Sequence, residues 1–318
     1  MSHRVREPTA IVGAGAVGQA LAQALSARHV PLTAIISRTQ TDATALAERV
    51  QADRASTSLA ALPQRTTRVL FCVPDTHLAE VAHALAQSPH RTAPWIAMHP
   101  SGAHPAHVLA PLRACGAALL SAHPLQTFTS STPPSAFHGI RMTIEGDAAA
   151  LDYGEALADL LGATPQRLSS AAKPLYHLAA VLASNGLVAL LVLAQRVWAA
   201  ADLNPDDAFA ALAPLIETTW ANVQRDGPAA LTGPAARGDA DTVATHLHAL
   251  QHTVSDLPLT DDVAEPLYAA LTETMLRIQE HQNALSATEA DRVRARMHQA
   301  RAPSPSENDS SENDSSST

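Results

Sequence analysis

The sequence predicts an α/β protein in which a doubly wound, mostly parallel sheet is followed by an all-helical C-terminal domain. As far as about residue 168, short apolar strand-like segments alternate with helix-like segments, which is typical of consecutive βαβ units. From there to about residue 300 the pattern is helical and is broken by turns that contain Asp, Gly and Pro. We therefore expect one domain over residues 1–168 and a second over residues 169–300.

The first strand, expected over residues 9–12, leads into the motif Gly13-Ala14-Gly15-Ala16-Val17-Gly18, and a helix begins near Gln19. This order of strand, glycine turn and helix binds dinucleotides in Rossmann folds. The first glycine allows the tight turn, the second lets the backbone approach the pyrophosphate, and the third allows close packing of the helix. The N-terminus of the helix offers unpaired N–H groups to the phosphates. We predict dinucleotide binding, with a glycine turn that binds nothing as the alternative.

The second strand, expected over residues 32–37, ends in Ser37-Arg38-Thr39. NAD enzymes typically carry an acidic residue near this point, which binds the ribose 2′-hydroxyl. A guanidinium can instead hold the 2′-phosphate of NADP with two hydrogen bonds, and the flanking hydroxyls can add others. The sequence therefore favours NADP over NAD, with an ordinary exposed arginine as the alternative. A helix over residues 42–50 follows.

Four more strands and three helices are expected in the first domain. The strands cover residues 68–73, 95–99, 117–122 and 141–145, and the helices cover residues 76–87, 105–115 and 148–161. Val73-Pro74-Asp75 follows the first of these strands, so we expect it to border the cofactor at the carboxyl edge of the sheet. Asp75 precedes a helix and is also predicted to be its N-cap.

Two further polar pairs follow strands of the predicted sheet. Ser101-Gly102 comes after the strand at residues 95–99, and His123-Pro124 comes after the strand at residues 117–122. Both pairs are therefore expected at the edge where substrates bind in doubly wound folds. Ser101 is predicted to hydrogen-bond a carboxylate or carbonyl of the substrate and His123 to polarise one. The alternative for each is a simple turn.

Lys173 is the only lysine in the chain, and the other basic residues of the 21 are arginine. An ammonium can be tuned by burial to exchange a proton, whereas a guanidinium cannot. A helix is expected from Pro174 to about residue 201. It would carry His177 and Asn185 on the side of Lys173, while its leucines and Val188 are free to face the core. We predict Lys173 as general acid or base, His177 as its partner and Asn185 as a substrate ligand, the alternatives being a surface lysine and a structural histidine.

Composition excludes several classes of protein. A net charge of −9 and a pI near 5.9 argue against nucleic-acid binding, which needs a basic surface. Cys72 and Cys115 are expected to be reduced thiols. The short polar N-terminus does not resemble a signal peptide, and the apolar run at residues 178–194 is interrupted by polar residues, so we predict a buried helix and no membrane partner. The expected location is the cytoplasm.

Several other motifs are assigned minor roles. Two groups of histidines suggest metal binding, but their spacing lacks a carboxylate partner and we expect no metal. They are His99, His104, His107 and His123, and then His246, His248 and His252. Asp239 is predicted to be an N-cap, and Arg237 beside it could hold an anionic substrate or form a structural turn or subunit contact. Residues 301–318 are rich in Ser, Asn, Asp, Glu and Pro, and we expect them to be disordered.

Taken together, the motifs resemble those of the Rossmann-like proteins that carry the domain of unknown function 2520. The resemblance rests on the glycine motif and on six other strings. These are Val73-Pro74-Asp75, His99 to Ala103, His123 to Phe128, Lys173 with Tyr176-His177, Ser184-Asn185, and Leu231 to Asp239. That family is distantly similar to ketopantoate reductase, pyrroline-5-carboxylate reductase and the β-hydroxyacid dehydrogenases. It implies NAD(P) binding, redox chemistry and a homodimer formed through the helical domain.

The resemblance also implies roles for individual residues. In the hydroxyacid and ketopantoate branches a lysine near the start of the interdomain helix handles the substrate oxygen, and Lys173 matches it. His177 stands where those enzymes have asparagine, so the chain departs from their pattern. The His-Pro pair at His123 is similar to one in prephenate dehydrogenases.

The sequence therefore predicts an NAD(P)-dependent oxidoreductase. It would transfer a hydride between a nicotinamide and a small, carboxylated hydroxy, keto or imino metabolite. The alternative is a non-catalytic NAD(P)-binding sensor or interaction protein, whose helical domain mediates assembly.

Overall fold

The computed structural model describes residues 5–88, 94–253 and 263–301. The chain forms two compact units that divide between Ser184 and Asn185. This division falls inside a long helical segment, whereas the last strand ends at Arg167. The domain boundaries expected at residues 168 and 300 stay a prediction, and the tail expected to be disordered lies outside the described residues beyond Arg301.

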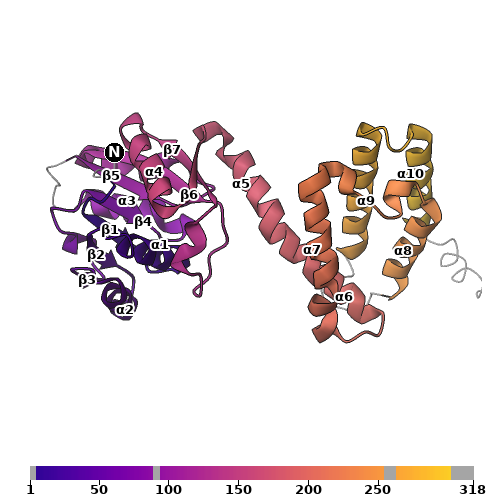
Figure 1. Ribbon diagram of the computed structural model, residues 1–318, viewed down its shortest axis with the longest axis horizontal. Coiled ribbons are helices and arrows are strands. Elements are labelled where there is room, and N and C mark those ends of the chain that lie inside the picture. The colour runs from indigo at the N-terminus through magenta and orange to yellow at the C-terminus, as the bar shows by residue number, and fades with distance from the viewer. Residues whose placement is uncertain (1–4, 89–93, 254–262, 302–318) are drawn as a thin grey trace, which may run out of the picture. The chain divides into compact units, whose positions relative to one another are not determined.

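One sheet organises the first unit, and the described part of the chain contributes eight strands to it in the order β3-β2-β1-β4-β5-β6-β7-β8 (Figure 1). Neighbouring strands are parallel except for β6 and β7. The strands are β1 (Thr9–Val12), β2 (Leu32–Ile36), β3 (Ala55–Ser56), β4 (Arg68–Phe71), β5 (Trp95–His99), β6 (Ala117–Pro124), β7 (Arg141–Gly146) and β8 (Thr164–Arg167). The predicted doubly wound, mostly parallel sheet is confirmed, and its order reverses between β1 and β4, where such sheets bind ligands.

The helices of the first unit follow the predicted pattern with a few differences. They are α1 (Ala16–Ser26), α2 (Gln40–Val50), α3 (Leu78–Ala86), α4 (Ala148–Leu161) and α5 (Lys173–Val181), with 3-10 turns η2 (Leu59–Ala61), η3 (Asp75–His77), η4 (Ala106–Cys115), η5 (Pro134–Phe137) and η6 (Ser170–Ala172). The segment η4 winds as a 3-10 helix and contains Pro111, which cannot donate a backbone hydrogen bond. Sequence analysis missed β3, which has two residues, and β8, which contains Pro165 and is largely exposed.

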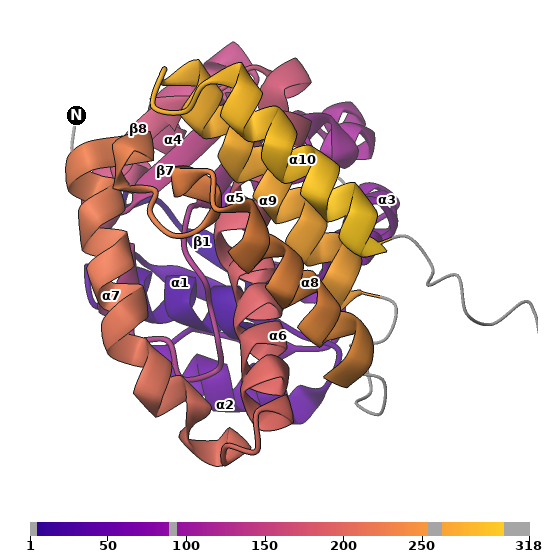
Figure 2. The same ribbon diagram turned by 90° about the vertical axis from the view of Figure 1, so that its right-hand side faces the viewer.

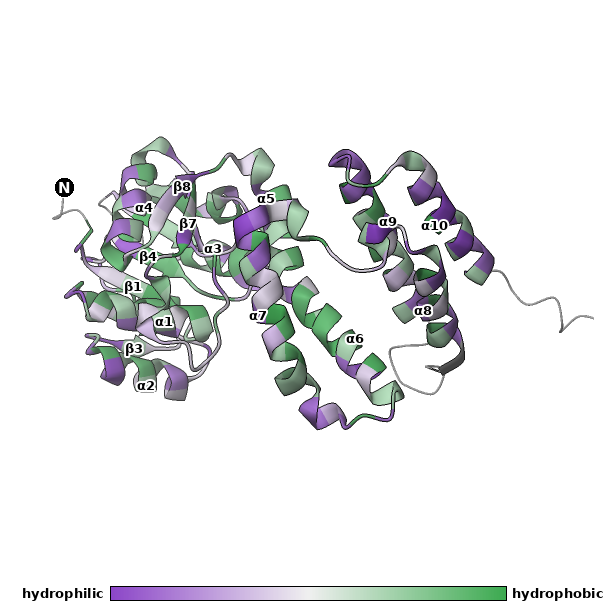
Figure 3. Ribbon diagram, turned by 45° about the vertical axis from the view of Figure 1, so that its right-hand side comes forward, coloured by the Kyte–Doolittle hydropathy of each residue, from purple (hydrophilic) through white to green (hydrophobic). Residues whose placement is uncertain are grey.

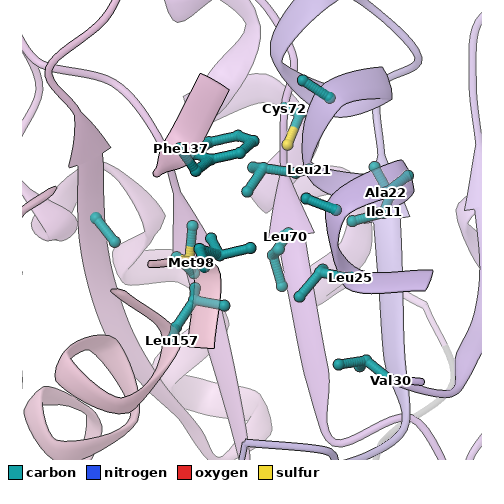
Figure 4. Packing of buried hydrophobic residues seen from close by; sticks show 14 of the residues in the cluster. Ile11, Leu21, Ala22, Leu25, Val30, Leu70, Cys72, Met98, Phe137 and Leu157 are labelled. Atoms are coloured by element: carbon teal, nitrogen blue, oxygen red, sulfur yellow. The ribbon is translucent and has the colours of Figure 1, made fainter. Parts of the chain in front are cut away.

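Apolar side chains cover both faces of the sheet. Ile11, Leu70 and Met98 belong to a cluster that includes Leu21 and Leu25 of α1 (Figure 4). Their strand neighbours, which point to the opposite face, pack against α3 and η4 in a second cluster. Because the strands are buried on both sides, their sequences read as continuous apolar runs and not as alternating patterns.

The second unit is helical, as predicted. Its described elements are α6 (Leu187–Ala200), α7 (Ala208–Asp226), α8 (Ala240–Thr253), α9 (Ala264–His281) and α10 (Ala287–Arg301), with 3-10 turns η8 (Pro205–Asp207), η9 (Gly227–Ala230) and η10 (Ala235–Arg237). The helices α8, α9 and α10 lie side by side (Figure 2) and share a core around Val243, Leu276 and Val293. The predicted N-cap at Asp239 is confirmed, because its carboxylate accepts a hydrogen bond from the N–H of Thr242 at 3.1 Å.

The helix predicted to start near Lys173 is confirmed, but its burial is not. It runs through α5, the π-helical turn η7 (Leu182–Gly186) and α6. The side chains expected to face the core are exposed, with exposed fractions of 73% for Leu175, 51% for Leu178, 65% for Leu182 and 60% for Val188. The prediction of a buried helix is therefore wrong for the single chain. In Figure 3, which colours the ribbon by hydropathy, most of α6 has the green of hydrophobic residues.

By length and composition alone, the described residues contain one helix that could cross a membrane, Ser170–Ala200. The apolar side chains that meet this criterion are not buried in the fold. The unit division also falls on this helix, so its two halves belong to different units.

Candidate active site

A pocket of about 450 Å³ lies at the carboxyl ends of β1, β2 and β4. Its volume is within the range of small-molecule sites. The predicted residues among those that line it are Gly13, Ala14, Gly15, Ser37, Arg38, Val73 and Pro74. Ala16, Val17, Gly18, Thr39 and Asp75, which were also predicted to bind the cofactor, do not line this pocket.

The three glycines of the motif have different surroundings. Gly13 has a φ of +109°, and a Cβ there would lie 2.3 Å from the carbonyl oxygen of Cys72. A Cβ on Gly18 would lie 2.0 Å from the carbonyl oxygen of Gly13, so this residue serves the packing of α1. A Cβ on Gly15 would meet nothing within 4 Å, because its backbone faces the open pocket. Gly15 is also the N-cap of α1 and provides no side chain to the first helical N–H groups.

The loop after β2 presents a cation to the pocket. Arg38 is exposed and lines it, and within the described chain its guanidinium forms no ion pair. Thr39 has a different role from the one predicted, because it caps α2. Its hydroxyl donates to Asp42 Oδ2 at 2.6 Å and accepts from the backbone N–H of Asp42. Arg38 therefore remains as the group suited to an additional phosphate.

Sequence analysis missed the far wall of the pocket. His77, Glu80 and Val81 line it from η3 and α3, and Thr57 and Leu59 line it after β3. His77 Nδ1 lies 3.2 Å from Glu80 Oε2. Residues 77, 80 and 81 follow β4, and their spacing places them on one face of the helix beside the carboxyl end of that strand. This pattern could have identified them. The loop at Thr57 could not be placed, since β3 was not recognised.

A second group of polar side chains lies at the ends of β5 and β6, next to this pocket. Asp75 does not cap a helix as predicted, since Pro74 is the N-cap of η3 and no side chain caps that turn. The Asp75 carboxylate instead accepts a hydrogen bond from Ser101 Oγ at 2.8 Å. This bond ties the loop after β4, which lines the pocket, to the loop after β5. Ser101 is buried, and its hydroxyl also accepts from the N–H groups of Ala103 and His104.

Lys173 is completely buried beneath this loop, with an exposed fraction of 0%. Its ammonium donates to the carbonyl oxygen of Ser101 at 3.1 Å and to Ser121 Oγ at 2.7 Å. Burial lowers the pKa of Lys173 from 10.5 to about 8, although the carboxylates of Glu145 and Asp75 oppose this change. A group that exchanges a proton with substrate has to reach it, so the geometry favours a charge-holding role over the predicted proton exchange.

Three aromatic side chains gather around Gly102. His123 Nδ1 lies 2.8 Å from the hydroxyl of Tyr176, and the two rings meet edge to face. His177 also packs edge to face on His123, with 6.2 Å between ring centroids. A Cβ on Gly102 would lie 2.7 Å from His177 Nδ1 and 2.9 Å from His123 Nε2. Both imidazoles thus approach the backbone at a point where only glycine leaves room.

The buried histidines are kept neutral. Burial lowers the pKa of His123 to about 4, and the nearby positive charge of Lys173 adds to this effect. Burial lowers the pKa of His99 to about 3, with Lys173 again contributing. His99 Nε2 is 3.2 Å from the carbonyl oxygen of Pro105, and its Nδ1 accepts from the N–H of Ser101, so His99 supports the loop.

The structure brings together four of the five predicted catalytic residues, namely Ser101, His123, Lys173 and His177. The fifth, Asn185, is exposed and begins the second unit. Its neighbour Ser184 hydrogen-bonds Thr127 at 3.2 Å. Sequence analysis did not single out Tyr176 as a site residue, and no local signal links it to His123, 53 positions away.

Other predicted features have simple outcomes. Cys72 and Cys115 are free thiols. In the described ranges, no group of three or more His, Cys, Asp and Glu side chains is arranged to hold a metal ion. Arg237 ends the short turn η10, and the roles left open for it, a contact with an anionic substrate or with another subunit, stay predictions.

Comparison with protein families now identifies both parts of the chain. Residues 2–124 match the family model of a Rossmann-like domain, and residues 140–284 match a domain of unknown function, DUF2520. The chain carries a Rossmann-like domain followed by a DUF2520 domain. The resemblance inferred from the sequence motifs is thereby confirmed. No curated protein matches the chain.

Solved structures share the fold of this Rossmann-like DUF2520 protein at low sequence identity. A protein from Bacteroides fragilis, provisionally named an NADP oxidoreductase, is 24% identical with a TM-score of 0.69, and the match covers 85% of this chain and 98% of that one. A reductive aminase from Aspergillus terreus, solved with NADPH and ethyl levulinate, is 18% identical with a TM-score of 0.60, covering 91% and 99%. An imine reductase from Myxococcus stipitatus, solved with NADP⁺, is 17% identical with a TM-score of 0.56, covering 92% and 99%.

Proposed function

We propose that this protein is an NADP-dependent oxidoreductase that reduces, or forms by oxidation, a C=O or C=N bond of a small metabolite. The observation that carries the proposal is the pocket at the switch point of the sheet. It joins a helix N-terminus without a side-chain cap, an open glycine backbone and Arg38, which forms no ion pair with any residue that the structure describes. When bound, a nicotinamide dinucleotide would supply or accept the hydride. The reductive aminase and imine reductase of similar fold were solved with NADPH and NADP⁺, which supports this choice.

The residues of this chain fit the proposed cofactor. The backbone of Gly13 to Gly15 and the first N–H groups of α1 would hold the pyrophosphate, and Arg38 would hold the 2′-phosphate. The loop of Val73 and Pro74 leads from this pocket to Ser101 through the Asp75 hydrogen bond. A substrate bound at Ser101 and Gly102 would therefore lie beside the far end of the dinucleotide.

In this proposal His123, His177 and Lys173 have different chemical roles. His123 exchanges the proton at the substrate heteroatom, and His177 helps to hold that atom. Lys173 holds a positive charge under the Ser101 carbonyl and adds to the effect of burial, which lowers the pKa of His123. A carboxylate on the substrate and a contact from Asn185 stay predictions, as does a cytoplasmic location.

Cofactor binding and turnover test the proposal together. The protein is titrated with NADPH and NADP⁺ by calorimetry and then incubated with 2-keto, 3-hydroxy and imino acids, ketones with amines, and their reduced products. Oxidation or reduction of the nicotinamide is followed by absorbance. Turnover of any substrate supports an oxidoreductase. Tight cofactor binding without turnover across the panel favours the sensor, and absence of binding refutes both.

Replacing Arg38 by alanine is expected to weaken NADPH binding by about ten- to a hundredfold and to leave NADH binding nearly unchanged. A hydrogen bond between charged groups is typically worth about 1.5–3 kcal/mol, and only NADPH carries the phosphate that would form it. Calorimetric titration with both cofactors measures the ratio. The matched control is Arg49→Ala, because Arg49 lies on α2 but does not line the pocket. Equal losses for the two cofactors would contradict the assignment of Arg38.

We further propose that a second copy of this chain covers the exposed apolar side of α5, η7 and α6. Lys173, Tyr176 and Ser184, on the same helix, hydrogen-bond to Ser101, Ser121, His123 and Thr127, so the N-terminal half of this helix packs against the folded first unit. A large exposed apolar patch with few charges is typical of permanent interfaces between subunits. These observations favour a homodimer over a membrane-bound monomer.

The double variant Leu178→Glu, Leu182→Glu is expected to convert a dimer into a monomer in sedimentation velocity experiments at micromolar concentration. Two charges placed in an apolar interface would be desolvated without partners. Val263→Glu is the matched control, since Val263 is as exposed as Leu178, at 51%, but lies at the start of α9. A monomeric wild type, or its sedimentation with phosphatidylcholine–phosphatidylglycerol vesicles, would refute the dimer.

A further inference from the structure

Two imidazole nitrogens converge on the space that a side chain at residue 102 would occupy. His123 Nε2 and His177 Nδ1 lie 2.9 and 2.7 Å from an ideal Cβ built on Gly102. His177 Nδ1 is buried and has no hydrogen-bond partner among the residues that the structure describes. A buried polar atom without a partner is costly unless a ligand or water satisfies it. His177 Nδ1 is therefore available to a polar ligand atom that lies against Gly102 and also reaches His123 Nε2.

The partner of His123 on its other side is Tyr176. The phenol oxygen lies 2.8 Å from Nδ1, so one of the two groups donates a proton to the other. Burial raises the pKa of Tyr176 and lowers that of His123 to about 4, so both groups are neutral near pH 7. A neutral imidazole carries a single N–H. If the phenol donates to Nδ1, the proton of His123 must lie on Nε2 and point toward Gly102.

Building on the proposed oxidoreductase function, we propose that the heteroatom of the reducible C=O or C=N bond binds above Gly102, between His123 Nε2 and His177 Nδ1. Tyr176 is a positioning residue, which fixes the tautomer in which His123 presents its Nε2 proton to that atom. The Nε2 proton of His123 would also stabilise the negative charge that develops on a carbonyl oxygen as the hydride arrives at its carbon.

The proposed step balances in protons and electrons. The hydride pair from the reduced nicotinamide forms the new C–H bond, and the π electrons of the C=O or C=N bond move to the heteroatom. That atom takes the Nε2 proton of His123, while Nδ1 takes the phenolic proton of Tyr176. Tyr176, which is partly exposed, recovers a proton from water. The sum is one hydride and one solvent proton added to the substrate, and the reverse reaction follows the same path.

The chain contains a matched control for Tyr176. Tyr268 forms the same kind of pair with His246 in the helical unit, with 2.7 Å between hydroxyl and Nδ1 and 5.6 Å between ring centroids, as in the pair of Tyr176 and His123. Tyr176→Phe and Tyr268→Phe therefore remove equivalent hydrogen bonds. Only the first is expected to affect chemistry at Gly102, and both full-length variants keep the aromatic ring.

The direct test is nitrogen NMR of the full-length protein labelled with ¹⁵N-histidine, with His123→Gln used to assign the signals. We expect His123 to be neutral at pH 7 with its proton on Nε2, and to become a mixture of tautomers in Tyr176→Phe. Tyr268→Phe should leave the His123 signals unchanged. A proton on Nδ1 in the wild type, or an unchanged tautomer in Tyr176→Phe, would overturn the proposal.

A kinetic experiment distinguishes a failure of this inference from a failure of the proposed function. For a substrate found in the panel, Tyr176→Phe should lower kcat by roughly tenfold, the net value of one well-placed hydrogen bond, with KM and NADPH affinity unchanged. Tyr268→Phe should keep the wild-type kcat. Equal kcat values in the two variants would refute the role of Tyr176. If no substrate is turned over, the oxidoreductase proposal fails, and the NMR experiment alone decides the tautomer.

Discussion

Replacing Lys173 by methionine is expected to lower turnover by about 10²- to 10³-fold without destabilising the protein at pH 7. The loss in rate is typical of removing one preorganised electrostatic group from an active site. The ammonium is buried with two neutral oxygens as partners, and methionine has a similar length without the charge. Replacing a buried charge by a well-packed apolar group is often neutral or stabilising. Ser121 Oγ would still donate to the Ser101 carbonyl at 3.3 Å.

The pH dependence of stability provides an independent check on this prediction. Because the pKa of Lys173 is lowered from 10.5 to about 8 in the folded state, the unfolded chain binds more protons between these pH values. The free energy of unfolding of the wild type therefore rises with pH in this window. Below pH 8 the buried Lys173 ammonium lowers that free energy by about 3 kcal/mol. We expect the difference in free energy of unfolding between Lys173→Met and the wild type, measured by urea unfolding, to favour the variant most below pH 8. This difference should shrink toward pH 10.5.

The control for this experiment is Arg68→Met. Arg68 is also buried, but it pairs with Glu7 at 2.7 Å and stacks on Tyr153, and it lies at the start of β4, opposite the active-site edge. Its loss should reduce stability and preserve turnover, the reverse of the pattern for Lys173. NMR should also show a higher pKa for His123 in Lys173→Met. Wild-type turnover in Lys173→Met would contradict the role given to Lys173 here.

The fold was largely predictable from sequence because its signals are local. The glycine motif, the apolar strands and the long helix after Lys173 each occupy a continuous stretch, and the structure has each of them within a few residues of its expected bounds. The missed strands have no such signal. β3 has two residues and β8 contains Pro165, so each is defined by pairing with a neighbouring strand and not by its own pattern.

The candidate site was only partly predictable, because its important contacts join distant residues. Position in the chain placed Ser101 and His123 at the carboxyl ends of strands, although His123 lies within β6 and not after it, and composition drew attention to Lys173. Neither could show that Asp75 accepts a bond from Ser101, or that Tyr176 holds His123. Burial was likewise out of reach of the periodicity, which indicated a buried face for Leu175, whereas the structure leaves this side chain exposed.

These differences have a common physical cause. The helix α5 faces the sheet edge with its polar residues, Lys173 and Tyr176, and leaves leucines outside. An amphipathic pattern shows that two faces differ, but it does not show which face the rest of the protein covers. A polar face is buried only where hydrogen bonds satisfy it, as Ser101 and Ser121 do for Lys173. Such an arrangement lowers stability, and it is expected where function requires it.

Replacing Gly102 by alanine is expected to lower kcat/KM by about 10²- to 10³-fold, the effect of losing a hydrogen-bond donor at a developing oxyanion. The added Cβ would fill the position on which His123 Nε2 and His177 Nδ1 converge, so the rings must move apart or the substrate heteroatom is excluded. NADPH affinity, measured by calorimetry, should be unchanged because Gly102 does not line the cofactor pocket.

The matched control for crowding is Gly154→Ala on α4. A Cβ there would lie 2.9 Å from Ile144 Cγ2, so the two substitutions introduce similar close contacts, one in the core and one at the site. Both variants should lose some thermal stability, because overpacking typically costs about 1–3 kcal/mol. Only Gly102→Ala should lose activity. If both variants keep the wild-type kcat/KM, the space above Gly102 does not hold the reacting atom, and the substrate must approach the cofactor from another side of the sheet edge.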